Sequence, residues 1–140
     1  PHPAGRTSHR TDDQFELVDE AIAMAVMYTA NHMSVKAIIA LTESGSTSRW
    51  MSRVRSDIPI YAMTPYVATR RRVALYRGVY PVSFEISETD RAHLYAEIFK
   101  TMLSKNLVEV GDLVIFTKGD LEGVSGSTNA MKILTVTAAE

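Results

Sequence analysis

The chain of 140 residues is 46% hydrophobic and 22% charged, the composition of one folded domain, and it is too short for a (β/α)8 barrel, which needs about 250 residues. Fifteen Lys and Arg residues and sixteen Asp and Glu residues give a net charge of −1, so the broad basic face of a nucleic-acid-binding protein is not expected. The sequence contains no cysteine and no apolar run near the roughly 20 residues that span a bilayer, which argues against disulfides, Cys-bound zinc, thiol catalysis and a membrane span.

The amino-terminal segment predicts a tail and then a long helix. Pro, Gly, Ser and Thr are frequent in the first ten residues, which show no hydrophobic period, so residues 1–12 are interpreted as a flexible tail or linker and residues 13–140 as one domain. Thr11 is a suitable N-cap, and apolar residues then recur at spacings of three and four to about His32. The predicted apolar stripe comprises Phe15, Val18, Ile22, Ala25, Val26 and Thr29.

Short apolar runs alternate with helical patterns along the rest of the chain. The runs are rich in β-branched residues, as expected of strands that are buried on both faces of a sheet. Strands are predicted at residues 35–41, 58–63, 79–85, 112–117 and 131–136. Helices are predicted at residues 49–57, at residues 65–76 with Thr64 as N-cap, and from residue 87 onward with the stripe Leu94, Tyr95, Ile98, Phe99, Met102 and Leu103.

This order of elements predicts the fold class. Helices that alternate with buried strands imply parallel pairing through right-handed crossovers, with helices on both faces of the sheet. The last strand follows its neighbour without a helix, so it is expected to be antiparallel and at or near an edge. The predicted fold is α/β: a three-layer α/β/α sandwich with a mostly parallel five-stranded sheet whose last strand is antiparallel.

Two polar loops follow predicted strands, at the end of the sheet where α/β proteins bind ligands. Residues 42–48 (TESGSTS) lie between the first strand and a helix, so side-chain hydroxyls and backbone N–H groups meet at a helix N-terminus. This pattern is typical of an anion or phosphate cradle. Ser and Thr are also common helix caps and loop residues, and the local pattern leaves both interpretations open.

The second loop, residues 118–129, follows the fourth strand. Its glycines allow close approach of the backbone to a ligand, and Lys118 supplies a cation. The loop is neither a Walker loop nor a Rossmann fingerprint, because a strand and not a helix follows it. A simple connection between two antiparallel strands is the alternative, and it remains equally open.

The remaining polar residues form no catalytic or metal-binding pattern. The four histidines are scattered without ligand spacing, and no nucleophile is accompanied by a base and an orienting group. Arg70, Arg71 and Arg72 are interpreted as the solvated face of a helix, with contact to another domain or subunit as the alternative. Trp50 is assigned to helix packing, with a ligand lid or a subunit contact as the alternative. We therefore expect a binding domain with no catalytic and no metal-binding residues.

Several motifs occur together in one order and cover nearly the whole chain from about residue 13. They are DEAIA (19–23) with LTESG (41–45), PIYAMT (59–64), LYRGVYP (75–81), and GDLVI (111–115) with GSTNAM (126–131). In this combination the sequence resembles the C-terminal regulatory domain of pyruvate kinase, of the bacterial type. The chain begins at Pro1 and not at Met, from which we expect a fragment of a longer protein.

The resemblance implies a role in glycolysis. Enzymes of this family transfer a phosphoryl group from phosphoenolpyruvate to ADP, giving pyruvate and ATP, with magnesium and potassium bound in a barrel domain that is absent from this chain. Their C-terminal domain binds allosteric effectors and packs against its counterpart in a tetramer. The resemblance therefore implies a cytoplasmic domain that is inactive alone, holds no cofactor, and has its own catalytic domain, further copies of itself and a phosphorylated metabolite as partners.

The resemblance also implies where the effector binds. The phosphate-cradling loop corresponds to residues 42–47, and the second wall of the pocket corresponds to the glycine loop. The residues implied are Thr42, Ser44, Gly45, Ser46 and Thr47 in the first loop, and Gly123, Ser125 and Gly126 in the second.

One departure from the family pattern concerns charge. Glu43 lies beside the expected phosphate, where relatives that use sugar bisphosphates can carry lysine or another non-acidic residue, and Asp120 and Glu122 make the second loop acidic. Coulomb repulsion of about 1–4 kcal/mol per close pair would weaken binding of a doubly phosphorylated ligand. A sugar monophosphate or nucleotide monophosphate is therefore favoured over a bisphosphate.

Two alternatives remain. The first is a purely structural assembly domain with a vestigial pocket. The second is a small stand-alone enzyme that acts on a phosphoester through Ser44 or Ser46, for which the local sequence offers only Glu43 as a base.

Overall fold

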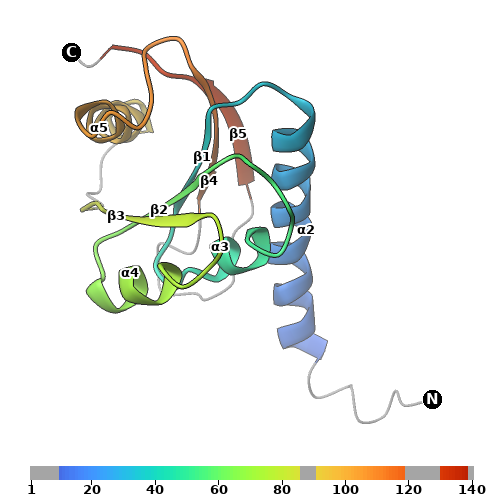
Figure 1. The fold of residues 1–140 in the computed structure, drawn as a ribbon. Coiled ribbons are helices and arrows are strands. Elements are labelled where there is room, and N and C mark those ends of the chain that lie inside the picture. Colours follow the sequence, from blue (N-terminus) through green and yellow to red (C-terminus); the bar gives the residue numbers. More distant parts are fainter. Residues whose placement is uncertain (1–9, 86–90, 119–129, 139–140) are drawn as a thin grey trace.

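The computed structural model describes residues 10–85, 91–118 and 130–138, and in them helices cover both faces of one five-stranded sheet (Figure 1). The strands are β1 (Ala37–Leu41), β2 (Ile60–Thr64), β3 (Val79–Ser83), β4 (Leu113–Lys118) and β5 (Ala130–Thr135). The helices are α2 (Arg10–His32), α3 (Ser46–Met51), α4 (Val67–Val73) and α5 (Arg91–Ser104).

The strand order is β3-β2-β1-β4-β5, which confirms the predicted fold class. The central strand β1 pairs in parallel with β2 and β4, and β2 pairs in parallel with β3. Among the described strands only the β4–β5 pair is antiparallel, with Phe116 opposite Lys132, and β5 lies at an edge as expected. Because β1, β2 and β4 run in the same direction, the loops that leave their carboxyl ends emerge at the same end of the sheet.

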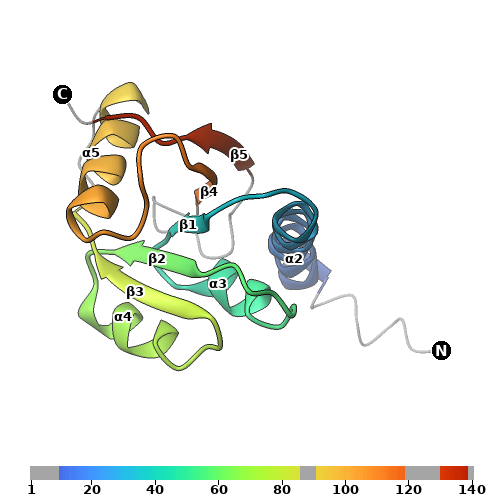
Figure 2. The ribbon, with the colours of Figure 1, turned by 45° about the horizontal axis from the view of Figure 1, so that its top comes forward.

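Two hydrophobic cores lie on opposite faces of the sheet. Ile39 and Leu41 of β1 face α5, while Ile38 and Ala40 face α2, α3 and α4, as the period of two in a strand requires. Figure 2 shows α5 alone on its side of the sheet. Each buried Ile or Leu stabilises the fold by about 1.5–3 kcal/mol, so both faces contribute to holding β1 in place.

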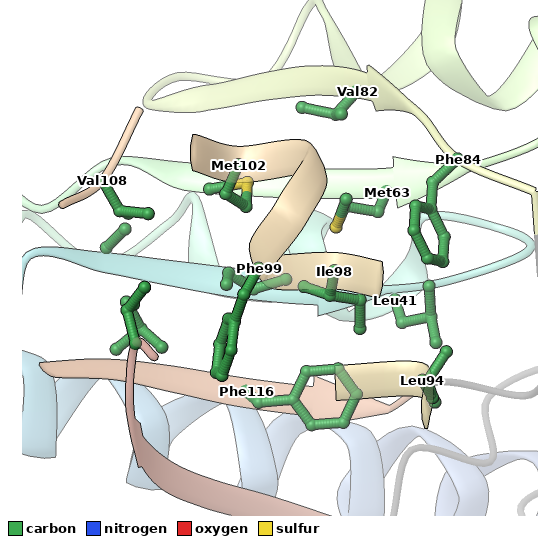
Figure 3. Close-up of a cluster of buried hydrophobic side chains, with 14 residues drawn as sticks. Leu41, Met63, Val82, Phe84, Leu94, Ile98, Phe99, Met102, Val108 and Phe116 are labelled. Atoms are coloured by element: carbon green, nitrogen blue, oxygen red, sulfur yellow. The ribbon is translucent and has the colours of Figure 1, made fainter. Parts of the chain in front are cut away.

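The core on the α5 face is built from the helical stripe that the sequence predicts. Leu94, Ile98, Phe99 and Met102 are buried, with Tyr95 and Leu103 partly buried beside them. Figure 3 shows the four buried side chains of α5 lying against residues of the strands, among them Leu41, Met63 and Phe116.

The predicted stripe of α2 is wrong in part, because its phase is shifted. Val26 is buried and Ile22 packs against the core as expected, but Val18 is 46% exposed and Ala25 is exposed too. The side chain of Phe15 lies outside the described residues. Small and apolar residues occur on all sides of α2, so their spacing alone did not identify the buried side. That side also contains a carboxylate, Asp19. The residues of α2 that are buried are Asp19, Ala23, Val26, Met27 and Ala30. Although α2 has 23 residues, no helix among the described residues is long and apolar enough to cross a membrane.

Both ends of two helices differ from the prediction. The helix predicted at residues 49–57 ends at Met51, and the helix predicted at residues 65–76 ends at Val73. The helix predicted at residues 49–57 begins three residues earlier, at Ser46, because Gly45 adopts a left-handed conformation and turns the chain directly into the helix. The helix predicted at residues 65–76 begins at Val67, with Tyr66 at the N-cap position. Thr64, the expected cap, is instead the last residue of β2, and its Oγ1 accepts a hydrogen bond from the Tyr66 N–H.

Candidate functional site

The structure places the five predicted residues of the first loop together at the carboxyl end of β1. This segment, residues 42–47, is called the Ser/Thr loop below. It leaves the central strand, turns at Gly45 and enters α3 at Ser46, with α2 on one side and α4 on the other (Figure 1). The predicted second wall, Gly123, Ser125 and Gly126, lies outside the described residues.

The hydroxyl groups of the loop bind its own backbone. The Gly45 N–H donates to Thr42 Oγ1 at 2.8 Å, and the Ser46 N–H donates to Ser44 Oγ at 3.2 Å. Thr42 and Thr47 are both buried. Two of the backbone N–H groups that a phosphate would use therefore already have acceptors, and a ligand would have to replace these contacts.

Gly45 is required by both backbone geometry and space. Its φ of +82° lies in the left-handed region, which costs any residue with a side chain about 1–2 kcal/mol. A Cβ at this position would lie 2.6 Å from Cγ1 of Val73 in α4. The glycine thus permits the Ser/Thr loop to pack directly on α4.

Two side chains of α4 hold the loop from this side. Thr69 Oγ1 donates to the carbonyl oxygen of Glu43. Arg72 Nη2 donates to the carbonyl oxygen of Ser44 at 2.9 Å and lies 3.3 Å from Thr69 Oγ1. The guanidinium of Arg72 therefore brings a positive charge to the Ser/Thr loop.

Sequence reasoning missed this role of Arg72. Arg71 and Arg72 are both exposed, as a solvated face requires, but Arg72 also reaches the loop. Arg70 is partly buried, and its Nη1 donates to the carbonyl oxygen of Thr64 at 2.9 Å. A signal was available: since β1 and β2 are parallel neighbours, the helix that follows β2 must start beside the loop that follows β1.

Asp19 of α2 is the second residue that the sequence analysis did not select. It is 1% exposed, and its Oδ2 accepts a hydrogen bond from Ser46 Oγ at 2.7 Å. The wrong phase assigned to the α2 stripe explains the omission, because it left this residue off the buried side. The carboxylate places negative charge at the start of α3, where it opposes binding of an anion.

Two buried hydroxyl groups near the site are not satisfied. Ser48 Oγ in α3 and Thr117 Oγ1 at the carboxyl end of β4 have no hydrogen-bond partner in the described part of the chain. Buried polar atoms without a partner are uncommon and often mark a place for a water molecule or a ligand. Trp50, in the same helix as Ser48, packs against the core as expected, with the Arg53 guanidinium 4.6 Å from the ring centroid.

The hydroxyl–carboxylate contact of the loop differs from the pairing found in activated serines. The pairing of Ser46 with Asp19 joins a hydroxyl to a carboxylate, whereas activated serines pair with a stronger base such as histidine. In residues 10–85, 91–118 and 130–138, no group of three His, Asp or Glu side chains could hold a metal ion.

Comparison with known proteins gives a consistent result. Residues 20–134 match the family model described as "Pyruvate kinase, alpha/beta domain". The chain is 47% identical over 131 residues to pyruvate kinase II of Salmonella typhimurium and 43% identical over 131 residues to a pyruvate kinase of Buchnera aphidicola, in each case covering 93% of this chain and 27% of the relative. A pyruvate kinase of Haemophilus influenzae is 39% identical over 130 residues, covering 91% of this chain and 26% of the relative. The chain thus spans about a quarter of the length of these relatives.

Proposed function

The chain belongs to the pyruvate kinase family, as its C-terminal alpha/beta domain, and from this premise we propose that it is the regulatory and assembly domain of a cytoplasmic enzyme that transfers a phosphoryl group from phosphoenolpyruvate to ADP. In this proposal the effector binds at the Ser/Thr loop. Catalysis, with its magnesium and potassium ions, belongs to a barrel domain of the full-length protein. The chain by itself is inactive and contributes binding and assembly.

The observation that carries the effector role is the place of the Ser/Thr loop. It leaves the central strand β1 at the ligand-binding end of a parallel sheet and is held between two helices. Arg72 supplies a cation there, and the unsatisfied hydroxyl of Ser48 lies in the helix that the loop enters. Polar groups that converge at the end of a rigid sheet are suited to orienting a small ligand.

The local charges support a ligand with one phosphate group. The contacts of the loop bring one arginine, Arg72, and one buried carboxylate, Asp19, and Glu43 is partly exposed beside them. A single phosphate can lie against the guanidinium, whereas a second phosphate would lie close to the carboxylates of Asp19 and Glu43. A sugar monophosphate or a nucleotide monophosphate is therefore the proposed effector class.

The assembly role is supported by an apolar surface along α2 and β5. The side of α2 that faces away from the sheet exposes Met24 (52%) and Tyr28 (67%), and Ile133 of the neighbouring edge strand β5 is 44% exposed. Surfaces of this kind commonly form contacts between subunits. We place contacts with further copies of the domain here, in a tetramer of the full-length protein.

An effector acts in this scheme by preferring one arrangement of the subunits. Such a preference shifts the equilibrium between two quaternary states, with a coupling free energy of typically about 1–3 kcal/mol. Rotation of subunits across their interface is the expected form of the change.

The effector role is tested by titrating the chain with glucose 6-phosphate and AMP. Trp50 lies four residues after Ser46 in α3, so its fluorescence reports binding at the Ser/Thr loop, and amide resonances of Ser44, Gly45 and Ser46 locate it. We expect saturable changes that weaken in Ser44→Ala. The matched control is Ser34→Ala, an exposed serine just before the amino end of β1. If neither compound causes a change up to millimolar concentration, the proposal that the domain binds an effector is wrong.

A second candidate is a structural assembly domain whose pocket is vestigial. The hydrogen bonds within the Ser/Thr loop favour it, as does the carboxylate of Asp19 on Ser46. This candidate differs in its outcome: the chain would self-associate to the same extent with and without phosphorylated compounds, and Ser44→Ala would not change that association.

A further inference from the structure

A hollow lies on the opposite face of the sheet from the contacts of the Ser/Thr loop. It lies between the first turns of α5 and the β4–β5 ladder and is partly open to solvent. Ligand sites in proteins combine apolar walls with a few polar groups. This hollow, called the α5 pocket below, is lined by Leu94, Tyr95, Phe116, Lys118, Ala130 and Lys132.

Two lysines point to the same side of the ladder. Lys118 is opposite Ala130, and Lys132 is opposite Phe116, so the two lysines are diagonal neighbours on one face of the antiparallel pair. Diagonal neighbours have their backbones roughly 7–8 Å apart, within reach of one another's long side chains. In the described part of the chain neither lysine forms an ion pair. Two like charges at this spacing repel each other, and an anion between them would remove the repulsion.

The walls of the pocket are aromatic and apolar. The rings of Tyr95 and Phe116 meet edge to face, with centroids 5.2 Å apart and planes at 81°. Leu94 is buried beside them, and the ammonium group of Lys132 lies 5.7 Å from the Tyr95 ring centroid. A partly exposed Tyr95 ring next to two cations provides both a surface for a planar group and charge for an acid group.

We propose that the α5 pocket binds a small aromatic anion, whose phosphate or carboxylate lies between Lys118 and Lys132 and whose ring lies against Tyr95 and Leu94. The inference rests on the α5 face alone and does not depend on effector binding at the Ser/Thr loop, which is contacted by α2 and α4.

The test is an amide-resolved NMR titration of the chain with phenyl phosphate. Separate titrations with inorganic phosphate and with phenol measure the binding of the head group and of the ring alone. Phenyl phosphate is expected to shift the amide resonances of Phe116, Lys118 and Lys132, and to bind more tightly than inorganic phosphate or phenol. Benzoate is expected to shift the same resonances, because the head group needs only negative charge.

Charge-removing variants give the quantitative readout. Lys118→Gln and Lys132→Gln are each expected to weaken phenyl phosphate binding by at least about fivefold, since each removes one charge-assisted hydrogen bond. The matched control is Lys105→Gln, an exposed lysine just after the carboxyl end of α5, which is expected to bind as the unmodified chain does. Unchanged dispersion of the remaining amide resonances shows that each variant is folded.

Three results would overturn the proposal. They are equal affinity of both lysine variants and the unmodified chain, binding of inorganic phosphate as tight as that of phenyl phosphate, and shifts confined to the amides of Ser44, Gly45 and Ser46. The last result would still leave the Ser/Thr loop as an anion site, so the two proposals fail separately.

Discussion

The polar groups on the two faces of the sheet differ in whether they already have partners within the described part of the chain. On the face of α2 and α4, the Ser/Thr loop is rich in hydroxyls, but they bind its own N–H groups and Asp19. On the α5 face, Lys118 and Lys132 lie beside aromatic walls without an ion pair among the described residues. The comparison teaches that the polar content of a segment does not measure its capacity to bind, because satisfied groups must first be released while unpaired charges already favour a ligand.

The largest expected effects are on stability, and they come from substitutions in the two hydrophobic cores. Met51 of α3 and Met102 of α5 are each fully buried on opposite faces. Met51→Ala and Met102→Ala should each lower the free energy of unfolding by about 2–5 kcal/mol, measured by urea denaturation. Met24→Ala, at an exposed position of α2, should change it by less than about 0.5 kcal/mol.

These variants also show whether the faces are independent. Hydrogen exchange should become faster at the Ser/Thr loop in Met51→Ala and at the β4–β5 ladder in Met102→Ala. Equal acceleration at both places in either variant would contradict the separation of the two faces.

A smaller effect tests how tightly the Ser/Thr loop packs on α4. Gly45→Ala combines a left-handed backbone with a Cβ that lies 2.6 Å from Val73 Cγ1. We expect a loss of about 2–4 kcal/mol in the free energy of unfolding. Gly78→Ala is the matched control, since its φ is +74° but nothing lies within 4 Å of its Cβ position, and about 1–2 kcal/mol is expected. Equal losses would mean that the loop does not press on α4.

A still smaller effect concerns Arg72, whose contact with the Ser/Thr loop the sequence analysis missed. Arg72→Gln removes the hydrogen bond to the Ser44 carbonyl, so we expect a loss of about 0.5–1.5 kcal/mol in stability and weaker binding of AMP at the loop. Arg71→Gln, its exposed neighbour, is the control and should change neither quantity. If both variants bind AMP equally well, Arg72 has no part in the site.

The smallest effect is one of pH on the α5 face. Burial raises the pKa of Tyr61 above its ordinary value of 10.0, and the neighbouring Tyr80 adds to the shift. Because the folded state favours the neutral phenol, this contribution to stability is complete below pH 10 and is lost as the pH rises above it. Tyr61→Phe should therefore lose stability less steeply above pH 10 in thermal unfolding, whereas Tyr66→Phe, at an exposed position, should follow the unmodified chain.

The sequence was a good guide to the sheet and to α5, because their signals are local. A buried strand such as residues 35–41 can be recognised from a short apolar run alone. In α5, the apolar residues gather on the side that contains Ile98 and Met102. It was a poor guide to the phase of α2, where apolar residues occur on both sides. The buried carboxylate of Asp19 could not be placed without knowing which element covers it.

The same limit applies to the candidate sites. The position of the Ser/Thr loop followed from its place after β1, but the satisfaction of its hydroxyls depends on which atoms meet in space. The pairing of Lys118 with Lys132 across the α5 pocket depends on the register of β4 and β5, which a strand pattern does not specify. The spacing of residues along the chain predicts which side of a helix or strand is buried. Which side chains of different elements contact one another can be known only from the folded structure.

The most direct measurement is one amide-resolved titration series in which the same sample receives glucose 6-phosphate and then phenyl phosphate. The account predicts two separate responses: glucose 6-phosphate shifts the amides of Ser44, Gly45 and Ser46, and phenyl phosphate shifts those of Lys118 and Lys132. A single set of shifts shared by both compounds, or no response at the Ser/Thr loop up to millimolar glucose 6-phosphate, would contradict it.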